Sequence, residues 1–304
     1  MIMDRKRIKN IAQLVLKILV TLAAIYIVVS KIDLHKLWMH IQDINLIFLS
    51  LALVVFVVAK IIEALRLNNY YRSIGVDLTE WQNIRLYWLG LFYNLFLPGG
   101  ISGDGYKVYW LKNKKDADLK KTIWATLINR LNGFLGILIL VVATAAMITL
   151  EYPYKSYVLV FIPVLYFLFY LGLRFFFRDF IPILPKTTAQ SVVIQVFQVA
   201  CIHLLLMGIG SYEHPVNYWF IFLASSVAFV IPVTLGGFGS REVVFVFAAD
   251  YLQVDVTAAI AMSLILYFIR ALVSFAGVYY LMNPKRILQP RAPTFTEKQI
   301  PPRE

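Results

Sequence analysis

The chain has 304 residues, of which 60% are hydrophobic and only 15% charged, and its mean hydropathy is +0.73. This composition excludes an ordinary soluble domain and predicts an all-α integral membrane protein, because apolar runs long enough to span a bilayer recur throughout. The single cysteine, Cys201, excludes an internal disulfide and a thiolate metal cluster within one chain. No His, Cys or carboxylate spacing resembles a metal site, and no cofactor is expected.

Six apolar segments are long enough to cross a hydrocarbon core of about 30 Å. In chain order, the predicted full spans are 11–30, 46–65, 122–150, 155–174, 188–212 and 257–282. The first run lacks a convincing small-residue cleavage site, so it is interpreted as a span and not as a cleavable signal peptide.

Two glycine-rich breaks interrupt this apolar sequence. The first, residues 97–104, reads LPGGISGD and lies between the second and third predicted spans. The second, residues 231–242, reads IPVTLGGFGSRE and lies between the fifth and sixth. Irregular backbone at membrane depth persists only where protein or a hydrated cavity covers its polar groups. Broken segments at corresponding places in two halves therefore point to a transporter's binding site.

Basic residues predict the orientation of the chain, since cytoplasmic loops carry most Lys and Arg. Of the 29 basic residues, 21 lie in the N-terminus, in 66–121, in 174–186 and in the tail, whereas the proposed outer loops hold only Lys31, Lys36 and Lys155. The net charge of +12 is therefore mainly a topology signal, and nucleic acid is not an expected partner. A plasma (inner) membrane protein with both termini in the cytoplasm is predicted.

This orientation makes each break the turn of a re-entrant hairpin. The segment around 82–105 enters from the cytoplasm and returns there, and 218–252 does the same from outside. Halves of about 10–150 and 154–283 then form an inverted repeat, the plan of many secondary transporters. Residues 1–283 are predicted to be one transmembrane domain.

The other polar segments are expected to lie in the cytoplasm. They are a loop at 103–121 and a disordered tail at 284–304, whose Pro, Lys and Gln content is typical of disorder.

The breaks, their separation and the surrounding spans resemble the flippase-like transmembrane domain of lysylphosphatidylglycerol synthases over about residues 10–283. Pro232 to Glu242 is similar to the family pattern Pro-Gly-Gly-x-Gly-x-Arg-Glu, although residues 233–235 separate the proline from the glycines. Residues 97–104 match a looser pattern, and Asn129-Arg130-Leu131 and Arg270 resemble recurrent charged positions. The resemblance implies movement of a phospholipid or polyprenyl-linked lipid between leaflets. Aminoacyl transfer is not expected, because the chain ends soon after the last predicted span.

Three charges near the second break are the first candidate substrate-binding residues. Arg241 and Glu242 follow a glycine turn predicted at membrane depth, where an uncompensated charge costs several kcal/mol. Arg270 lies 13 residues into the last predicted span, roughly 20 Å from its outer end and so near the midplane. Arg241 could hold a lipid phosphate through its guanidinium group, with Glu242 orienting it or titrating. The alternative is a structural salt bridge to a neighbouring span.

The remaining candidates belong to the breaks and to the third span. Asp104 begins a predicted helix, where helix capping and a functional role are both open. Arg130 is expected at the inner interface. Four glycines could serve positive-φ turns or close approach to a headgroup; they are Gly99, Gly100, Gly236 and Gly237.

Three classes of function follow. The leading one is a transporter or flippase for a membrane lipid, in which the expected partner is a phosphate-bearing lipid. The second is an integral-membrane enzyme that modifies a lipid headgroup, for which no recognisable nucleophile–base pair is present. The third is a scaffold for a lipid-modifying enzyme, docked through the 103–121 loop, and homo-oligomerisation is also left open.

Overall fold

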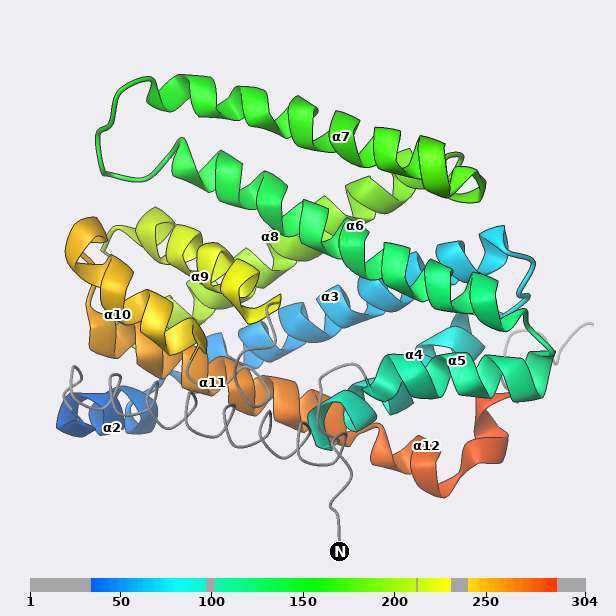
Figure 1. The fold of residues 1–304 in the computed structure, drawn as a ribbon. Helices are drawn as coiled ribbons and strands as arrows, with labels where there is room; N and C mark the ends of the chain where they lie inside the picture. The colour runs from blue at the N-terminus through cyan, green and yellow to red at the C-terminus, as the bar shows by residue number, and fades with distance from the viewer. Residues whose placement is uncertain (1–33, 97–101, 212, 231–239, 289–304) are drawn as a thin grey trace, which may run out of the picture.

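A computed structural model describes residues 34–96, 102–211, 213–230 and 240–288 (Figure 1). All regular structure in these residues is helical, in agreement with the predicted all-α class. The α-helices and short 3₁₀ helices (η) are α2 (Leu34–Gln42), α3 (Leu46–Ser73), α4 (Glu80–Phe96), α5 (Ser102–Lys115), α6 (Leu119–Ala145), η1 (Lys155–Val160), α7 (Phe161–Phe176), η2 (Arg178–Phe180), α8 (Leu184–Gly208), α9 (Pro215–Val230), α10 (Ser240–Leu252), α11 (Val256–Phe275), α12 (Val278–Met282) and η4 (Pro284–Ile287).

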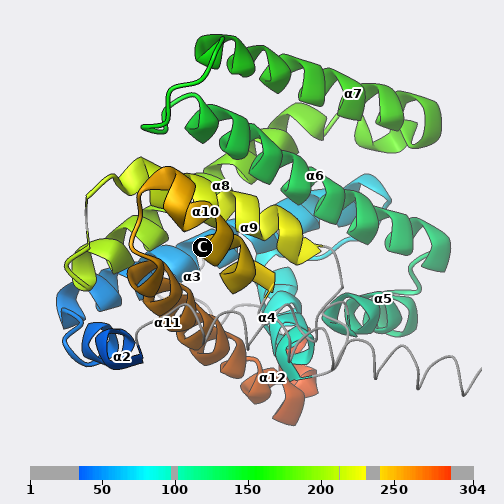
Figure 2. The same ribbon diagram turned by 60° about the vertical axis from the view of Figure 1, so that its left-hand side comes forward.

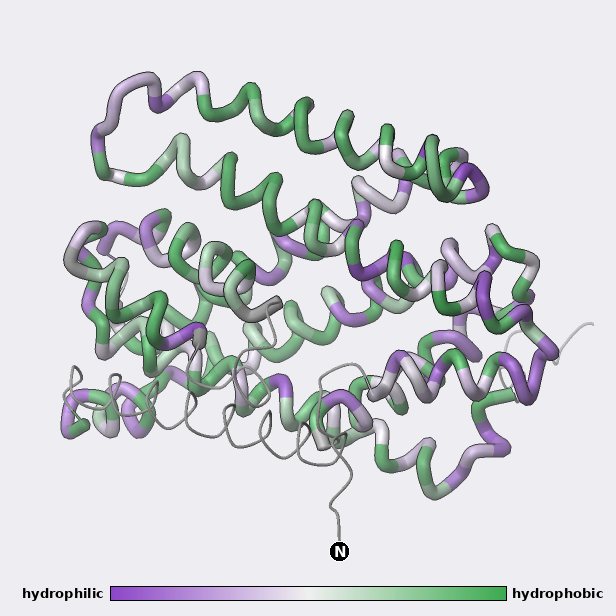
Figure 3. The backbone as a smooth tube through the Cα atoms, in the orientation of Figure 1, coloured by the Kyte–Doolittle hydropathy of each residue, from purple (hydrophilic) through white to green (hydrophobic). Residues whose placement is uncertain are grey.

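Five of the described segments are long and apolar enough to cross a membrane, and hydrophobic residues dominate them (Figure 3). They are Leu46–Ser73, Leu119–Ala145, Lys155–Phe176, Leu184–Gly208 and Val256–Met282. They correspond to the last five predicted spans, whereas the first, 11–30, lies outside the described residues. The protein is therefore a multi-pass membrane protein.

Polar caps, which an apolar count does not detect, set the beginnings of three of these helices. The side chains of Asn45, Asp118 and Asp255 accept hydrogen bonds from the backbone N–H groups of Ile47 (2.9 Å), Lys121 (2.7 Å) and Thr257 (2.8 Å). In contrast, α7 lies at the edge of the bundle (Figure 1) and exposes large apolar side chains, as a lipid-facing helix does. These include Phe167, Leu168, Phe175 and Phe176.

Two pairs of shorter helices pack as hairpins: α4 on α5, and α9 on α10. The two glycine-rich breaks lie between the paired helices in the sequence, and residues 97–101 and 231–239 of these breaks lie outside the described residues. Figure 1 shows α4–α5 towards one end of the long helices and α9–α10 towards the other. The two hairpins are also separate in the turned view of Figure 2.

Helix packing follows the same scheme on both sides of the central α3–α8 contact. Helix α3 contacts α4 and α6, just as α8 contacts α9 and α11. Each long helix that follows a hairpin then packs on the first arm of the other hairpin, since α6 contacts α9 and α11 contacts α4. One buried apolar cluster fills the α8–α11 side and another the α3–α6 side. Trp88 of α4 packs against both.

The two arms of the first hairpin meet backbone to backbone. A Cβ atom added to Gly103 of α5 would lie 1.9 Å from the carbonyl oxygen of Gly90 in α4. Just beyond this contact, the side chain of Asn94 accepts a hydrogen bond from the Gly103 N–H (2.8 Å). The Ser102 hydroxyl donates to the carbonyl of Tyr93 (2.7 Å). The first turn of α5, where N–H groups have no intrahelical partner, is thereby fixed to α4.

The structure differs from the sequence analysis at the polar segment 103–121. Residues up to Lys115 continue α5 and do not form a loop. The helix is stabilised by a buried face that includes Val108, Trp110 and Leu111. The high charge of the segment had suggested a loop, because these apolar residues are few among the lysines.

The beginning of the expected disordered tail is also ordered. Pro284–Ile287 form η4, in which Ile287 is fully buried. From α4, Gln82 donates a hydrogen bond to the carbonyl of Leu288 (2.9 Å) and Arg85 donates to that of Arg286 (2.6 Å). Residues 289–304 lie outside the described part of the chain.

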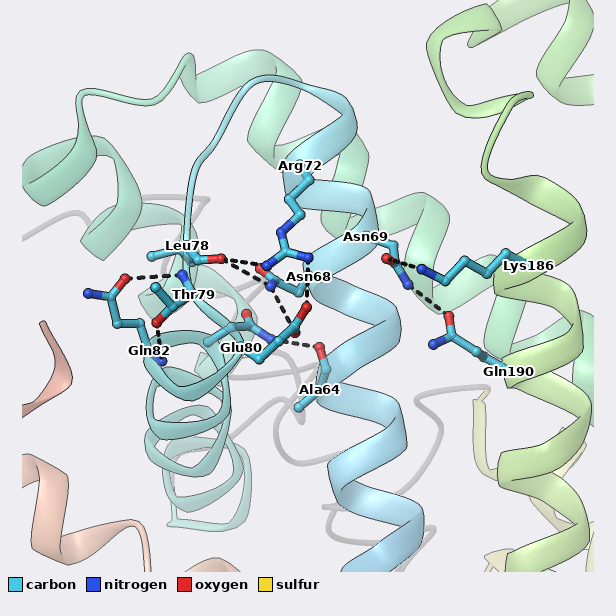
Figure 4. A network of polar contacts seen from close by, with 11 residues as sticks. Ala64, Asn68, Asn69, Arg72, Leu78, Thr79, Glu80, Gln82, Lys186 and Gln190 are labelled. Carbon is cyan, nitrogen blue, oxygen red and sulfur yellow. Dashed lines mark hydrogen bonds and ion pairs between the residues drawn. The ribbon is translucent and has the colours of Figure 1, made fainter. Parts of the chain in front are cut away.

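Polar contacts fix the corner between α3 and α4 (Figure 4). Arg72 forms an ion pair with Glu80 (2.6 Å) and donates to the carbonyl of Leu78 (3.1 Å). On another side of α3, Asn69 donates to Gln190 of α8 (2.9 Å). Arg72 and Glu80 are largely exposed, with 45% and 42% of their side-chain surfaces accessible, so this pair contributes little to stability.

Candidate functional site

The second hairpin carries a buried cation and a buried carboxylate at the start of α10. Arg241 donates a hydrogen bond to the Ser226 hydroxyl of α9 (3.0 Å). Its guanidinium carbon lies 4.7 Å from the centroid of the Phe222 ring in the same helix. Glu242 turns towards α11, where the Ser263 hydroxyl donates to Oε1 (2.7 Å). Both residues are buried, so the first turn of α10 joins α9 to α11 through charged side chains.

Helix α11 adds two further polar groups. The guanidinium carbon of Arg270 lies 5.7 Å from the centroid of the Tyr267 ring. Arg270 and Tyr267 both interact electrostatically with Arg241, and Tyr267 also interacts with Glu242. The structure thus brings together Arg241, Glu242 and Arg270, although 28 positions separate Glu242 from Arg270 in the sequence. We call Arg241, Glu242, Tyr267 and Arg270 the second charged cluster.

The first hairpin carries a comparable group, the first charged cluster, made of Tyr87, Asp104, Lys107 and Arg130. One oxygen of Asp104 contacts Lys107 Nζ (2.6 Å), and the other contacts Nε of Arg130 in α6. Lys107 Nζ lies 4.9 Å from the centroid of the Tyr87 ring in α4. Asp104 therefore lies in the first turn of a helix, as expected, but its carboxylate bridges two cations.

The two charged clusters share one plan. In each, a cation on the second arm of the hairpin packs on an aromatic ring of the first arm: Lys107 on Tyr87, and Arg241 on Phe222. Each also contains one carboxylate on the second arm and one arginine on the following long helix. With one carboxylate for two cations, each cluster carries an excess of one positive charge. An environment of this kind suits an anionic ligand.

Sequence reasoning missed Lys107, which it counted only as a cytoplasmic charge. The side chain of Lys107 is 4% exposed, so it does not face the aqueous phase. Its spacing of three positions from Asp104 on a helix was the available signal, because residues three apart lie on the same face.

A third polar group lies between α3, α6 and α8 and was also missed. Arg66, counted as a loop charge, is buried. Its Nε donates to Asn129 (3.0 Å) and its Nη1 to Ser191 (2.6 Å). Gly133 leaves room for it, since a Cβ there would lie 3.0 Å from Arg66 Nη2. Asn132 extends the group by donating to the Tyr70 hydroxyl (2.8 Å).

This third group continues towards the first charged cluster. Lys60 and Glu63 form an ion pair three positions apart on α3 (2.6 Å), and Glu63 also interacts with Tyr87. Lys60, Glu63 and Arg66 therefore occupy one face of α3 at spacings of three, a pattern that was visible in the sequence.

The four glycines proposed for substrate binding lie outside the described residues; they are Gly99, Gly100, Gly236 and Gly237. Among the residues that are described, no group of three His, Cys, Asp or Glu side chains is placed to hold a metal ion.

Residues 14–277 match the family described as the lysylphosphatidylglycerol synthase TM region. The chain belongs to this family. Both charged clusters lie within the residues that match this family. The match confirms the resemblance found in the sequence and indicates a function related to membrane lipids. No curated protein and no solved structure is significantly similar to the chain.

Proposed function

We propose that the protein moves a phosphate-bearing lipid, either a phospholipid or a polyprenyl-linked lipid, between the two leaflets of the plasma membrane. The observation that carries this proposal is the second charged cluster. Two arginines and one glutamate gather there at a glycine-rich break, in a chain whose family is related to membrane lipids. A guanidinium group forms paired, charge-assisted hydrogen bonds with phosphate oxygens. Arg241 is the proposed phosphate ligand, supported by Arg270 and oriented by Glu242.

The proposed substrate-binding residues also include Asp104 and Arg130 of the first charged cluster. Gly99, Gly100, Gly236 and Gly237 complete the set as positions where backbone can approach a headgroup.

An inverted repeat would give this site access to both leaflets. The proposed halves contain α3–α6 and α8–α11, with α4–α5 and α9–α10 as re-entrant hairpins that enter from opposite sides. The matching helix contacts of the two halves support this arrangement, as do the hairpins' positions near opposite ends of the long helices (Figure 1). The bias of basic residues orients α4–α5 and both termini towards the cytoplasm.

Labelling from the two sides of the membrane tests this topology. In a Cys201→Ala background, a cysteine at Lys114, near the end of α5, should react with an impermeant thiol reagent from the cytoplasm. A cysteine at Ser211, just after α8, should react only from outside. Reaction of both positions from the same side would contradict the inverted repeat.

Leaflet exchange by the purified protein tests the proposed function itself. In vesicles that contain a fluorescent phospholipid, the protein should make inner-leaflet lipid accessible to an impermeant quencher faster than in protein-free vesicles. Lys112→Gln is a matched control, because Lys112 lies on the exposed end of α5 and pairs with Asp116 (2.9 Å). It should retain wild-type exchange.

The same preparation separates the alternative functions. Exchange no faster than in protein-free vesicles, for phospholipid and polyprenyl-phosphate lipids alike, would contradict a flippase. Formation of a modified lipid by the purified protein would instead favour a headgroup-modifying enzyme. Loss of a partner's activity after changes in 103–121 would favour a scaffold.

A further inference from the structure

The first charged cluster contains an anion that belongs to the protein. Asp104 uses one oxygen for Lys107 and the other for Arg130, so its carboxylate occupies the position between two cations. A carboxylate that bridges two cations resembles a phosphate group in its charge and in its use of two oxygens. One of these cations could therefore bind a phosphate in place of the carboxylate.

Within the first charged cluster, side-chain exposure increases from Lys107 through Asp104 to Arg130. The accessible fraction of the side chain is 4% for Lys107, 15% for Asp104 and 39% for Arg130. An incoming ligand thus reaches Arg130 first, meets Asp104 next, and is separated from Lys107 by the carboxylate.

Packing holds the buried side of the cluster in place. Lys107 packs on the Tyr87 ring, and Gly90 lies beside its side chain, since a Cβ there would be 3.1 Å from Lys107 Cε. The backbone contact of Gly103 with Gly90 fixes the turn of α5 that carries Asp104. Movement is therefore easiest for the Asp104 and Arg130 side chains.

We propose that the first charged cluster is a second binding site for a lipid phosphate, in which the phosphate displaces Asp104 from Arg130. Asp104 keeps its contact with Lys107, and the phosphate takes over the guanidinium group of Arg130. A phosphodiester carries one negative charge, which neutralises the excess positive charge of the cluster. Neutralisation is most favourable beside Lys107 and Asp104, whose side chains are largely buried. This second site rests on the proposed function, and it adds a lipid-binding position in the half of the chain that does not contain Arg241.

Binding stoichiometry tests the proposal. The full-length protein in detergent is titrated with dioctanoylphosphatidylglycerol, and the number of bound lipids is counted by native mass spectrometry. Dioctanoylglycerol, which lacks the phosphate, gives the background. We expect two phosphate-dependent lipids on the wild type, one on Arg130→Gln, one on Arg241→Gln and none on the double variant. Inorganic phosphate in excess should compete only weakly if a lipid headgroup is the ligand, and strongly if free phosphate is.

Arg72→Gln provides the matched control. Arg72 also pairs with a carboxylate, Glu80, at 2.6 Å, and its side-chain exposure of 45% is similar to that of Arg130. This variant should still bind two lipids. Binding of two lipids by Arg130→Gln would overturn the proposal. Loss of a lipid from Arg72→Gln would also overturn it, because the effect of Arg130→Gln would then be explained by the loss of any exposed positive charge.

Asp104→Asn distinguishes a competing carboxylate from a structural one. If the phosphate must displace Asp104, the neutral amide should tighten binding at the first site by roughly threefold to tenfold, the equivalent of one competing hydrogen bond. Unchanged or weaker binding would contradict displacement. Arg130→Lys offers a second measurement that leaves Asp104 in place. It keeps the charge without the planar fork, so it should retain two lipids with weaker binding.

The outcome for this site can be separated from the outcome for transport. Two bound lipids without leaflet exchange would contradict the proposed function but not the second site. Leaflet exchange by a protein that binds only one lipid would contradict the second site alone.

Discussion

Arg241→Gln should reduce leaflet exchange by about tenfold to a hundredfold while the protein remains folded. Hydrogen bonds that involve a charged group contribute about 1.5–3 kcal/mol, and about 1.4 kcal/mol corresponds to a factor of ten in rate. Glutamine removes the charge and the guanidinium fork but can still form a hydrogen bond with Ser226 of α9. The phosphate contact is therefore lost, whereas the helix contact has a substitute.

A purely structural role for Arg241 predicts a different result. Removing one member of a buried ion pair costs about 3–5 kcal/mol, because the other charge is left uncompensated. Glu242→Gln in addition should then restore much of the stability. The structure favours the first outcome, since the Glu242 carboxylate accepts a hydrogen bond from Ser263 (2.7 Å) that Arg241→Gln leaves in place.

Exchange rate and melting temperature are measured together for both single variants and the double variant. Ser226→Ala is the control for the helix contact, because it removes the hydroxyl that accepts from Arg241 and keeps the guanidinium group. It should retain most of the exchange activity. Normal exchange by a well-folded Arg241→Gln protein would remove Arg241 from the mechanism.

Arg66→Ala should cause the largest loss of stability among the substitutions considered. It leaves the Asn129 and Ser191 side chains without their contacts to the guanidinium group, and it removes a positive charge near Glu63. The expected cost is about 2–6 kcal/mol, because each of the two partners loses a hydrogen bond to a charged group, at about 1–3 kcal/mol per bond. Arg66→Met, which retains more of the side-chain volume, should be less damaging but still unfavourable.

Arg72→Ala is the matched control on the same helix. Arg72 lies six positions later and forms an exposed ion pair with Glu80 (Figure 4), so its loss should cost only about 0–1 kcal/mol. Denaturant unfolding in detergent, followed by tryptophan fluorescence, gives both values. Equal costs for the two substitutions would show that the α3–α6–α8 polar group does not stabilise the fold.

The long helices could be predicted from the sequence because length and apolar composition are properties of a continuous segment. The hairpins could be located through their proline and paired glycines, which interrupt such segments. The burial of Arg66 and Lys107 could not be predicted from a count of charges. A basic residue near the end of a span can face water or the bundle, and only the packing of other helices decides between them.

The candidate site was predicted one residue at a time. Burial costs identified Arg241, Glu242 and Arg270, and position after a break identified Asp104. The Asp104–Arg130 contact joins residues 26 positions apart on different helices, so it depends on how α5 packs on α6. No local pattern specifies that packing. Lys107 is different, since its helical spacing from Asp104 made the pair predictable.

The glycine contact between α4 and α5 determines how the first hairpin can move. With backbone against backbone at Gly90 and Gly103, no layer of side chains can repack to let one arm slide along the other. A second close approach, in which a Cβ at Gly277 would lie 2.3 Å from the carbonyl oxygen of Trp88, holds α4 against the end of the last span. We therefore expect the two arms of the hairpin to move together as one rigid body. A movement of this hairpin relative to α6 would separate Asp104 from Arg130, which is on α6. It would leave the contact between Asp104 and Lys107 in place, because both residues are on α5.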